Sequence, residues 1–443
     1  MYSAAEASVA NTGSGRQAAC YVGDMKVSRF AGIAVCIAVC IGVCIGVSGV
    51  AAAQTMTRDK VIDRHPSYGE PLEKVVDFFA SATFPSVVVG GRVGMYLYRS
   101  TTDTLAGPWT RSTLTPSGNS YERARAIRFP GDAYPGVVAS IGNQIIWFEN
   151  PRNRDPGADI TLPWRQHVIN PDHGCHDIQL VDLDGDGRID VVCSAGISLG
   201  APQFVAFQDD RDHWQLVYDV VDAGDAIAVV RIGSDATPNL VADDHSGHLN
   251  WYENPRLKGT GAGPGAGAGA RTSNWVRHYI GPGNLGNSLG VGPVASARDD
   301  VMTAANEDEG PGGSVDERGL TWYEQPANPD EPWIAHPVAA DFRDIHEINI
   351  GRWRGNTPYF LVAEQEQACK PARPEGRPPS HPRTSCRIAM FQWTHGKLRK
   401  TILARTSTHN QSVIPWRDGL LMADANHGVY GASKAIHLRV IKP

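Results

Sequence analysis

Three stretches of the sequence repeat one pattern, in which a tryptophan, a glutamate and a proline are followed by a second tryptophan and a histidine. They read "IIWFENPR" then "LPWRQHVI", "LNWYENPR" then "SNWVRHYI", and "LTWYEQPANP" then "EPWIAHPV". Each pair has the aromatic and β-branched content of two adjacent strands. The residues at equivalent places are Trp164, Trp275, Trp333, His167, His278 and His336. Such recurrence is typical of packing residues rather than of a site.

Two further strands joined by a turn precede these pairs, for example "HDIQLVDLDGDGRIDVVCSAG" and "DAIAVVRIGSDATPNLVADD". The same arrangement recurs in "RARAIRFPGDAYPGVVAS", "SLGVGPVASARDDVMTAANED" and "HEINIGRWRGNTPYFLVAEQ". A first unit, "VVDFFASATFPSVVVGG", and a last, "NQSVIPWRDGLLMADANHG", bring the number to seven. Period and strand number predict an all-β chain, a seven-bladed β-propeller of four-stranded antiparallel blades.

The last unit ends after "AIHLRVIKP", which is only its third strand. We expect residues 59–67, "DKVIDRHPS", to supply the fourth strand, because a ring that remained open would expose two free sheet edges. The Gly/Ala-rich residues 259–270 fall between the third and fourth strands of the fourth unit, where we expect a flexible outer loop.

One turn carries four aspartates within nine positions, in "DLDGDGRID". Carboxylates this close repel one another unless a hard cation lies among them. An EF-hand is excluded, because Cys193 stands where its bidentate glutamate belongs and the flanks read as strands rather than helices. We therefore expect a calcium-binding β-hairpin turn. Its expected ligands are Asp182, Asp184, Asp186, Asp190 and the carbonyl of Arg188. The alternative is a polar Asp/Gly turn without metal.

The aspartate loop "VDLDGDGRIDVV" and the "WYENP" units that follow resemble the FG-GAP or VCBS repeat family, over roughly residues 60 to 443. That family includes the propeller of integrin α subunits. The chain is also similar to the propeller of aldos-2-ulose dehydratase and to propeller polysaccharide lyases. The resemblance implies sugar binding at the axial mouth, and it carries calcium over only to residues 182 to 190.

The N-terminus has the pattern of an export signal. A short basic region from Met25 precedes a long apolar run, and "AAAQ" supplies a cleavage pattern near Ala53. We expect residues 1–54 to be an extension and signal peptide, residues 55–443 to be the propeller, and the mature protein to be secreted or periplasmic. Met25 is an alternative start, and an uncleaved membrane anchor is the minority alternative.

Four cysteines follow the apolar run, and export favours disulfides. Cys369 and Cys386 bracket a Pro-rich excursion that a bridge between them would close. Cys175 and Cys193 flank the aspartate loop, where they form either a second disulfide or two buried thiols.

The formal charge of -6 is mild, and no long basic run offers a track for nucleic acid. We expect a monomer with a carbohydrate partner, no nucleic acid partner, and no stable membrane insertion after signal cleavage.

In each blade the start of strand one and the end of strand two lie on the face opposite the aspartate loop. This mouth is rich in histidine, arginine and carboxylate, and its residues vary from blade to blade, as a grafted site would. The candidate catalytic residues are His176, His346, Arg123, Arg125, Glu347 and His409. The candidate substrate-binding residues are Asp177, Asp244, His245, Glu307, Glu364, Asn426 and His427.

Two functions follow from this reading. The first, implied by the resemblance, is elimination on a sugar or uronic acid by a lyase or dehydratase, which needs a base for the α-proton and a cation for the enolate. His176 or His346 would be the base, with Arg123, Arg125 or a second divalent metal as the electrophile. The pairs His176–Asp177 and His346–Glu347 should face each other across the funnel. Alternatively the carboxylates only satisfy backbone amides.

The second function is a non-catalytic propeller that binds a glycan or a protein. Hydrolase readings are weaker, because neither G-x-S-x-G nor H-E-x-x-H occurs.

Overall fold

Strands make up nearly all of the secondary structure in the computed structural model of the chain. It describes residues 56–63, 68–74, 86–91, 94–100, 108–117, 120–194, 201–234, 236–255, 271–273, 275–283, 288–304, 319–342, 345–353, 357–364, 386–394, 396–406, 412–416, 419–425 and 436–441. All of these belong to one unit, Ala53–Pro443. The predicted signal segment, its cleavage near Ala53, the loop 259–270 and Cys369 lie outside the described residues.

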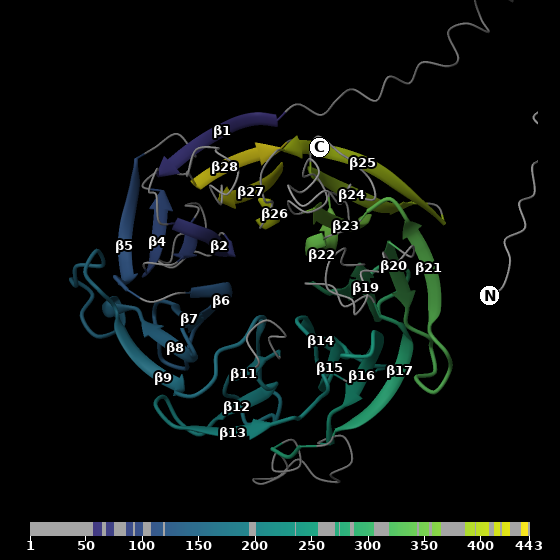
Figure 1. Cartoon of the computed structure of the whole chain (residues 1–443), viewed down its shortest axis with the longest axis horizontal. Helices are drawn as coiled ribbons and strands as arrows, with labels where there is room; N and C mark the ends of the chain where they lie inside the picture. Colours follow the sequence, from purple (N-terminus) through teal and green to yellow (C-terminus); the bar gives the residue numbers. More distant parts are fainter. Residues whose placement is uncertain are drawn as a thin grey trace, which may run out of the picture. The chain divides into compact units, whose positions relative to one another are not determined.

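Seven four-stranded antiparallel sheets can be followed in Figure 1. The first two in chain order are β2 (Tyr68–Lys74), β3 (Ser86–Gly91), β4 (Gly94–Ser100) and β5 (Trp109–Thr115), then β6 (Ser120–Ile127), β7 (Gly136–Ile141), β8 (Gln144–Glu149) and β9 (Arg165–Asn170). The third is β10 (Ile178–Val181), β11 (Asp190–Cys193), β12 (Phe204–Gln208) and β13 (Trp214–Tyr218). In each sheet the strands pair in the order in which they follow along the chain.

The next three sheets repeat this order. They are β14 (Ile227–Arg231), β15 (Pro238–Asp243), β16 (His248–Glu253) and β17 (Val276–Pro282), then β18 (Gly290–Pro293), β19 (Asp299–Ala304), β20 (Leu320–Glu324) and β21 (Ile334–Ala339), then β22 (Ile345–Trp353), β23 (Thr357–Glu364), β24 (Cys386–Thr394) and β25 (Lys397–Thr406).

The seventh sheet joins the two ends of the described chain. Its order is β26 (Ser412–Trp416), β27 (Gly419–Ala425), β28 (Ile436–Ile441) and then β1 (Met56–Asp63), so the N-terminal strand is its fourth. β1 pairs antiparallel with β28 from Met56 opposite Ile441 to Asp63 opposite Ile436. The expected terminal pairing is therefore present. Of the predicted residues 59–67, those from 59 to 63 lie in β1, and residues 64–67 are outside the described ranges.

The first strands of the sheets contact one another in a closed order. β2 contacts β6, β6 contacts β10, β10 contacts β14, β14 contacts β18, β18 contacts β22, β22 contacts β26, and β26 contacts β2. Every second side chain of a strand points to the same face. Side chains of these first strands that face one another can therefore meet, although they are far apart in the sequence.

Apolar clusters fill the spaces between neighbouring sheets. One cluster unites Val138 and Trp147 of the β6–β9 sheet with Val191 and Phe204 of the β10–β13 sheet, all of them buried. Equivalent clusters join the β2–β5 sheet to the β6–β9 sheet, the β10–β13 sheet to the β14–β17 sheet, the β14–β17 sheet to the β18–β21 sheet, and the β18–β21 sheet to the β22–β25 sheet. The core therefore lies between sheets, and inner strands such as β7 and β12 bury both faces, which explains their near-continuous apolar runs.

The repeated tryptophan and histidine form one packing unit in three sheets. A third-strand tryptophan stacks on a fourth-strand histidine at ring-centroid distances of 4.1, 3.9 and 4.2 Å. The histidine Nε2 lies 3.2, 3.3 and 3.0 Å from the carboxylate of the glutamate two residues after that tryptophan. The three sets are Trp147, His167 and Glu149; Trp251, His278 and Glu253; and Trp322, His336 and Glu324. These histidines are packing residues, as their recurrence predicts.

The Asn or Gln that follows the glutamate ends the third strand in each repeat. Its side-chain amide donates to a backbone carbonyl where the second strand begins: Asn150 to Pro135 at 3.1 Å, Asn254 to Pro238 at 3.0 Å and Gln325 to Asp299 at 2.8 Å. The three amide side chains are fully buried, so each bond satisfies a group that would otherwise be costly to bury.

Two features differ from the sequence expectation or add to it. The first strand of the first sheet is Tyr68–Lys74, ahead of the predicted "VVDFF", and its register shifts on both sides of Pro71, which has no amide to donate. The described residues contain one short 3-10 helix, Pro151–Asn153.

No helix in the described part of the chain is long and apolar enough to span a membrane.

Candidate functional site

The aspartate loop is the turn between β10 and β11, as its flanking residues predict. Gly185 and Gly187 adopt positive φ angles of 73° and 86°, which glycine reaches without strain, and they let the loop curl around its own carboxylates. Asp182 accepts from the amide of Gly187 at 2.9 Å. The sequence therefore shapes the loop locally, by Asp and Gly at fixed offsets.

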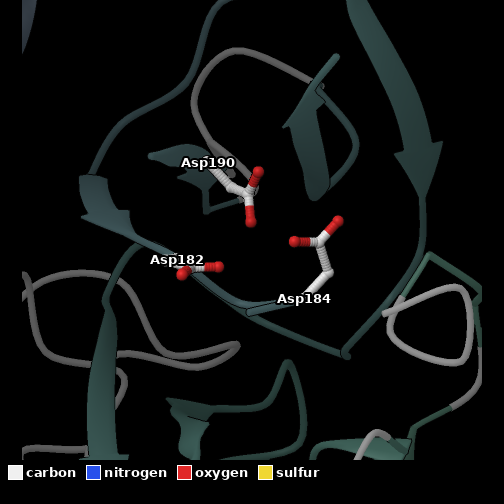
Figure 2. A group of neighbouring side chains, drawn as sticks. All are labelled: Asp182, Asp184 and Asp190. Atoms are coloured by element: carbon white, nitrogen blue, oxygen red, sulfur yellow. The ribbon is translucent and has the colours of Figure 1, made fainter. Parts of the chain in front are cut away.

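Three carboxylates of this loop converge. Asp182, Asp184 and Asp190 each offer an oxygen, and these oxygens all lie within 4.8 Å of one another. Figure 2 shows the three side chains pointing toward a common space. Hard oxygen donors at this spacing suit a divalent cation such as calcium or magnesium. The residues present therefore fit a divalent metal.

Asp186, also predicted as a ligand, is engaged differently, and coordination by the backbone carbonyl of Arg188 stays a prediction. The Asp186 carboxylate forms ion pairs with Arg188 and, at 3.2 Å, with Arg271. Arg188 Nε donates to the carbonyl of Gln208 at 2.8 Å. Asp186 is thus directed toward two guanidinium groups and is absent from the converging set.

Asp190 is fully buried at the start of β11, where its two oxygens accept from the amides of Leu183 and Gln208 at 2.8 and 3.0 Å. Burial raises the pKa of its carboxyl to about 7, against the lowering effect of those amides, and the charges of Asp184 and Asp186 add to the rise. A cation beside Asp190 would favour the charged carboxylate that burial disfavours.

Asp300, at the matching place in the β18–β21 sheet, accepts from the amides of Val294, Ala295 and Gln325 in the same way. Burial raises its carboxyl pKa as well. A buried aspartate near the start of the second strand therefore also has a structural role that does not require a metal. The aspartate loop differs from the β18–β21 sheet in its two additional carboxylates, Asp182 and Asp184.

A second candidate site lies where the first strands meet. A polar cavity of about 260 Å³ is lined by residues of β6, β14 and β22 and by residues in or just before β10 and β18. We call it the axial cavity. Four of the predicted site residues line it: Arg123, Arg125, Asp177 and Glu347. These four residues come from three different sheets, and only the comparison between repeats allowed the sequence to predict that they converge.

Asp177 organises the charged side of the axial cavity. Its Oδ1 lies 3.2 Å from Arg125 Nη2 and 3.9 Å from Arg123 Nε, and it accepts from the amide of Ile178 at 2.8 Å. Its Oδ2 accepts from the Gln179 side chain at 3.2 Å. Arg123 and Asp177 are each 5% exposed, so this cluster is held in a low-dielectric environment where its charges interact strongly.

Glu347 enters the cavity from β22, and its Oε1 accepts from Asn349 at 2.8 Å. Gln179 and Asn349 also line the cavity and were not predicted. Each stands two residues after a predicted carboxylate, on the same face of a strand, so the period-2 rule would have found both.

His176 is buried and lies outside the lining of the axial cavity. Its Nδ1 is 3.1 Å from the backbone carbonyl of Asp225, which also accepts from Ser194 at 2.9 Å. His176 thus links the β10–β13 sheet to the segment before β14. The side chain of His346 lies outside the described residues, so the expected facing of the two histidines stays a prediction.

The remaining predicted residues are dispersed. Glu364 is fully buried in an ion pair with Arg387, at 2.6 Å. Asp244 lines a different pocket, and His245 is exposed beside Asp222, with Nδ1 2.8 Å from its carboxylate. Outside the described residues lie Glu307, His409, Asn426 and His427.

Cys175 and Cys193 form a disulfide with their Cα atoms 5.5 Å apart, which confirms the bridge and excludes the alternative of two thiols. It anchors the residue before His176 and Asp177 to the end of β11. Cys386 is also disulfide-bonded.

Comparison with known proteins does not assign the chain to a family. No family model matches the sequence, and no curated protein matches it. Among solved structures, the chain is similar to a protein of unknown function from Dyadobacter fermentans DSM 18053, at 12% sequence identity and a TM-score of 0.41, over 88% of this chain and 99% of that one.

Proposed function

We propose that the seven sheets are the blades of a seven-bladed β-propeller of the FG-GAP or VCBS type. Three observations support this: four antiparallel strands in every sheet, first strands that contact one another in a closed order, and a last sheet completed by the N-terminal strand. Pairing of the two ends leaves no sheet without its fourth strand, which is how propellers protect their edges.

The aspartate loop binds calcium in this proposal, through Asp182, Asp184 and Asp190. The role of the cation is structural, because it is bound far from the axial cavity. Asp182 of the loop and Asp177 of the cavity lie at opposite ends of β10. Five residues of extended chain span roughly 16 Å. A cation in the loop therefore stabilises the hairpin and does not touch a ligand held by Asp177.

The axial cavity binds an acidic sugar. Its volume lies just below the range of about 300–1,000 Å³ typical of ligand cavities, which suits one sugar ring. The observation that carries this is the placement of two arginines in one polar cavity. Guanidinium groups pair with carboxylates in bidentate fashion, so Arg123 and Arg125 are suited to the carboxylate of a uronic acid.

The proposed reaction is elimination, which makes the protein a carbon–oxygen lyase. Glu347 accepts the proton next to the sugar carboxylate, the electron pair of that C–H bond forms a carbon–carbon double bond, and the C–O bond on the neighbouring carbon breaks. The departing oxygen takes up that proton from Glu347, which returns to its carboxylate form. Arg123 and Arg125 stabilise the negative charge that develops on the carboxylate. Glu347 replaces His176 as the favoured base, because His176 bonds to the Asp225 carbonyl.

The test is the ultraviolet absorbance of the new conjugated double bond when the purified protein meets a panel of uronic-acid polysaccharides. Arg125→Gln and Glu347→Gln should each lower the rate by at least about a hundredfold. Arg128→Gln, at an exposed arginine just after β6, is the matched control and should leave the rate unchanged. If Glu347→Gln retains full activity, the proposed base is wrong.

A second candidate function is binding of the acidic sugar without turnover. The extensive engagement of Asp177 favours it, since both of its oxygens already accept hydrogen bonds. In that case calorimetry detects binding that Arg125→Gln weakens, and no absorbance develops.

The disulfide between Cys175 and Cys193 supports export to an oxidising compartment, and we propose a secreted or periplasmic location on that basis.

A further inference from the structure

A second pocket, of about 400 Å³, lies on the outer half of the β14–β17 sheet. It is lined by Asp244, His248, Asn250, Arg277 and Tyr279, none of which lines the axial cavity. We call it the rim pocket. Asp244 follows β15, His248 and Asn250 belong to β16, and Arg277 and Tyr279 belong to β17.

Asp244 is the buried anchor of the rim pocket, with 1% of its surface exposed. Its Oδ1 accepts from the amides of Ser246 and His248, both at 2.9 Å. Its Oδ2 accepts from Asn250 Nδ2 at 3.0 Å and lies 3.6 Å from Arg277 Nη1. One carboxylate thus orients the asparagine and the arginine and offsets the charge of the guanidinium.

Asn250 brings an acceptor to the pocket that the protein leaves unused. Its side-chain nitrogen donates both to Asp244 and to the carbonyl of His248, which assigns the amide orientation. No described residue donates to its Oδ1, although Asn250 is only 2% exposed. This oxygen is not among the fully enclosed polar atoms of the described residues that lack a partner, so it reaches the pocket surface, where a ligand hydroxyl can donate to it.

Tyr279 and Arg277 supply the rest of a recognition surface. Tyr279 is 59% exposed, and the His248 ring meets its ring edge-on at a centroid distance of 5.8 Å. Arg277 makes one ion pair with its five N–H donors, so most of them remain available. An aromatic face beside one free acceptor and several free donors matches a sugar ring, which has apolar C–H faces and hydroxyls that both donate and accept.

The repeats provide an internal control. The stacked Trp251–His278 pair has counterparts in Trp147–His167 and Trp322–His336, and the same strand registers surround all three. At the position before the tryptophan, Asn250 is replaced by Ile146 and Thr321. Around the histidine, Arg277 becomes Gln166 and Ala335, and Tyr279 becomes Val168 and Pro337. The scaffold therefore does not require the polar set, which is present in one of the three sheets.

We propose that the rim pocket binds a neutral hexopyranose unit of a glycan, with the sugar ring on Tyr279 and hydroxyls at Asn250 Oδ1 and the Arg277 guanidinium. A neutral sugar is favoured because Asp244 offsets the charge of Arg277. This site goes beyond the axial cavity and does not depend on it.

The test is isothermal titration of the full chain with methyl glycosides of glucose, galactose and mannose and with neutral oligosaccharides of each. Binding of one of them should weaken at least about tenfold in Tyr279→Val and in Asn250→Thr, the loss expected when a ring contact or a hydrogen bond is removed. Both substitutions introduce a residue that an equivalent strand already carries, so the sheet should still fold. Val276→Ala, at an exposed residue of β17 outside the pocket, is the matched control and should bind as the unaltered chain does.

Absence of binding by every neutral sugar at millimolar concentration would overturn the proposal, as would undiminished binding in Tyr279→Val. Arg125→Gln separates the two sites, since it should remove acidic-sugar binding in the axial cavity and leave neutral-sugar binding intact. If Arg125→Gln abolishes neutral-sugar binding, the sugar occupies the axial cavity and the rim assignment is wrong.

Discussion

Arg271 Nε lies 2.6 Å from Oδ2 of Asp184, although 87 positions separate the two residues in the sequence. The same guanidinium also pairs with Asp186 at 3.2 Å and with Asp209, and it lies 5.5 Å from the centre of the Phe207 ring. Arg271 follows the Gly/Ala-rich residues 259–270, in the segment that leads to β17. An arginine from the next sheet thus neutralises part of the aspartate loop.

Arg271→Gln should therefore destabilise the protein in the absence of a divalent cation and enlarge the stabilisation that a cation gives. Without one, the variant loses charged hydrogen bonds and unfolds more easily, by about 1.5–3 kcal/mol. With calcium, the loop no longer shares Asp184 with a guanidinium, and the cation should raise the melting temperature more than it does in the unaltered chain. Thermal unfolding in a chelator and in calcium measures both effects. Equal destabilisation in the two conditions would show that Arg271 does not compete with a cation.

Removal of calcium should lower the melting temperature, because a cation bound only to the folded state stabilises it by mass action, by about 2.7 kcal/mol at a hundredfold excess over its dissociation constant. Asp184→Ala should abolish this response to calcium. Asp330→Asn, at an exposed aspartate on a loop remote in sequence, should retain it. A calcium response that survives Asp184→Ala would contradict the proposed site.

The raised pKa of Asp190 predicts how stability depends on pH in a chelator. The unfolded carboxyl has its ordinary pKa of 3.8 and the folded one a pKa of about 7, so between these values the folded state holds a proton that the unfolded state has lost. Stability from this group is therefore greatest at low pH and falls as pH rises toward 7, by at most about 1.4 kcal/mol per pH unit.

Calcium binding should show the reverse dependence, because the cation must displace that proton. Its apparent affinity should rise with pH up to about 7 and then level off. Denaturant unfolding in a chelator and calcium titration between pH 5 and pH 8 check the two trends. Asp190→Asn should flatten the chelator curve, because an amide side chain does not titrate. The substitution should be tolerated, because in the β14–β17 sheet Asn239 accepts from the third-strand end in the same way, at 2.9 Å from the amide of Asn254. A slope that persists in Asp190→Asn would assign it to other groups.

A chain that begins at Tyr68 should aggregate, because it lacks β1 and exposes the edge of β28. It also loses the hydrogen bond at 2.6 Å from the Tyr98 hydroxyl to Asp63, which joins β1 to the neighbouring sheet. Light scattering and size-exclusion chromatography would detect the aggregate. The matched control begins at residue 54 and keeps β1, so it should be monodisperse. A soluble Tyr68 chain with unchanged melting would count against closure by β1.

The repeats determined much of the fold before any tertiary contact was known. Strand pairs, the terminal pairing and the packing role of His167, His278 and His336 all follow from local alternation and from comparison between units. The aspartate loop is predictable for the same reason, since all of its converging ligands lie within one turn. Strand β2 is the exception: "YGEPLEK" has little strand propensity, and pairing with β3 across a shifted register holds it extended.

Only the tertiary structure decided which polar side chains meet. Asp177 lines the axial cavity and its neighbour His176 does not, because successive side chains of an extended segment point to opposite faces. Asp244 belongs to the rim pocket and Glu364 to a buried pair with Arg387, although the sequence grouped both with the axial residues. Arg271 reaches Asp184 across 87 positions. A local pattern specifies the face of a strand, whereas contacts between sheets depend on how the sheets are placed relative to one another, which no single repeat encodes.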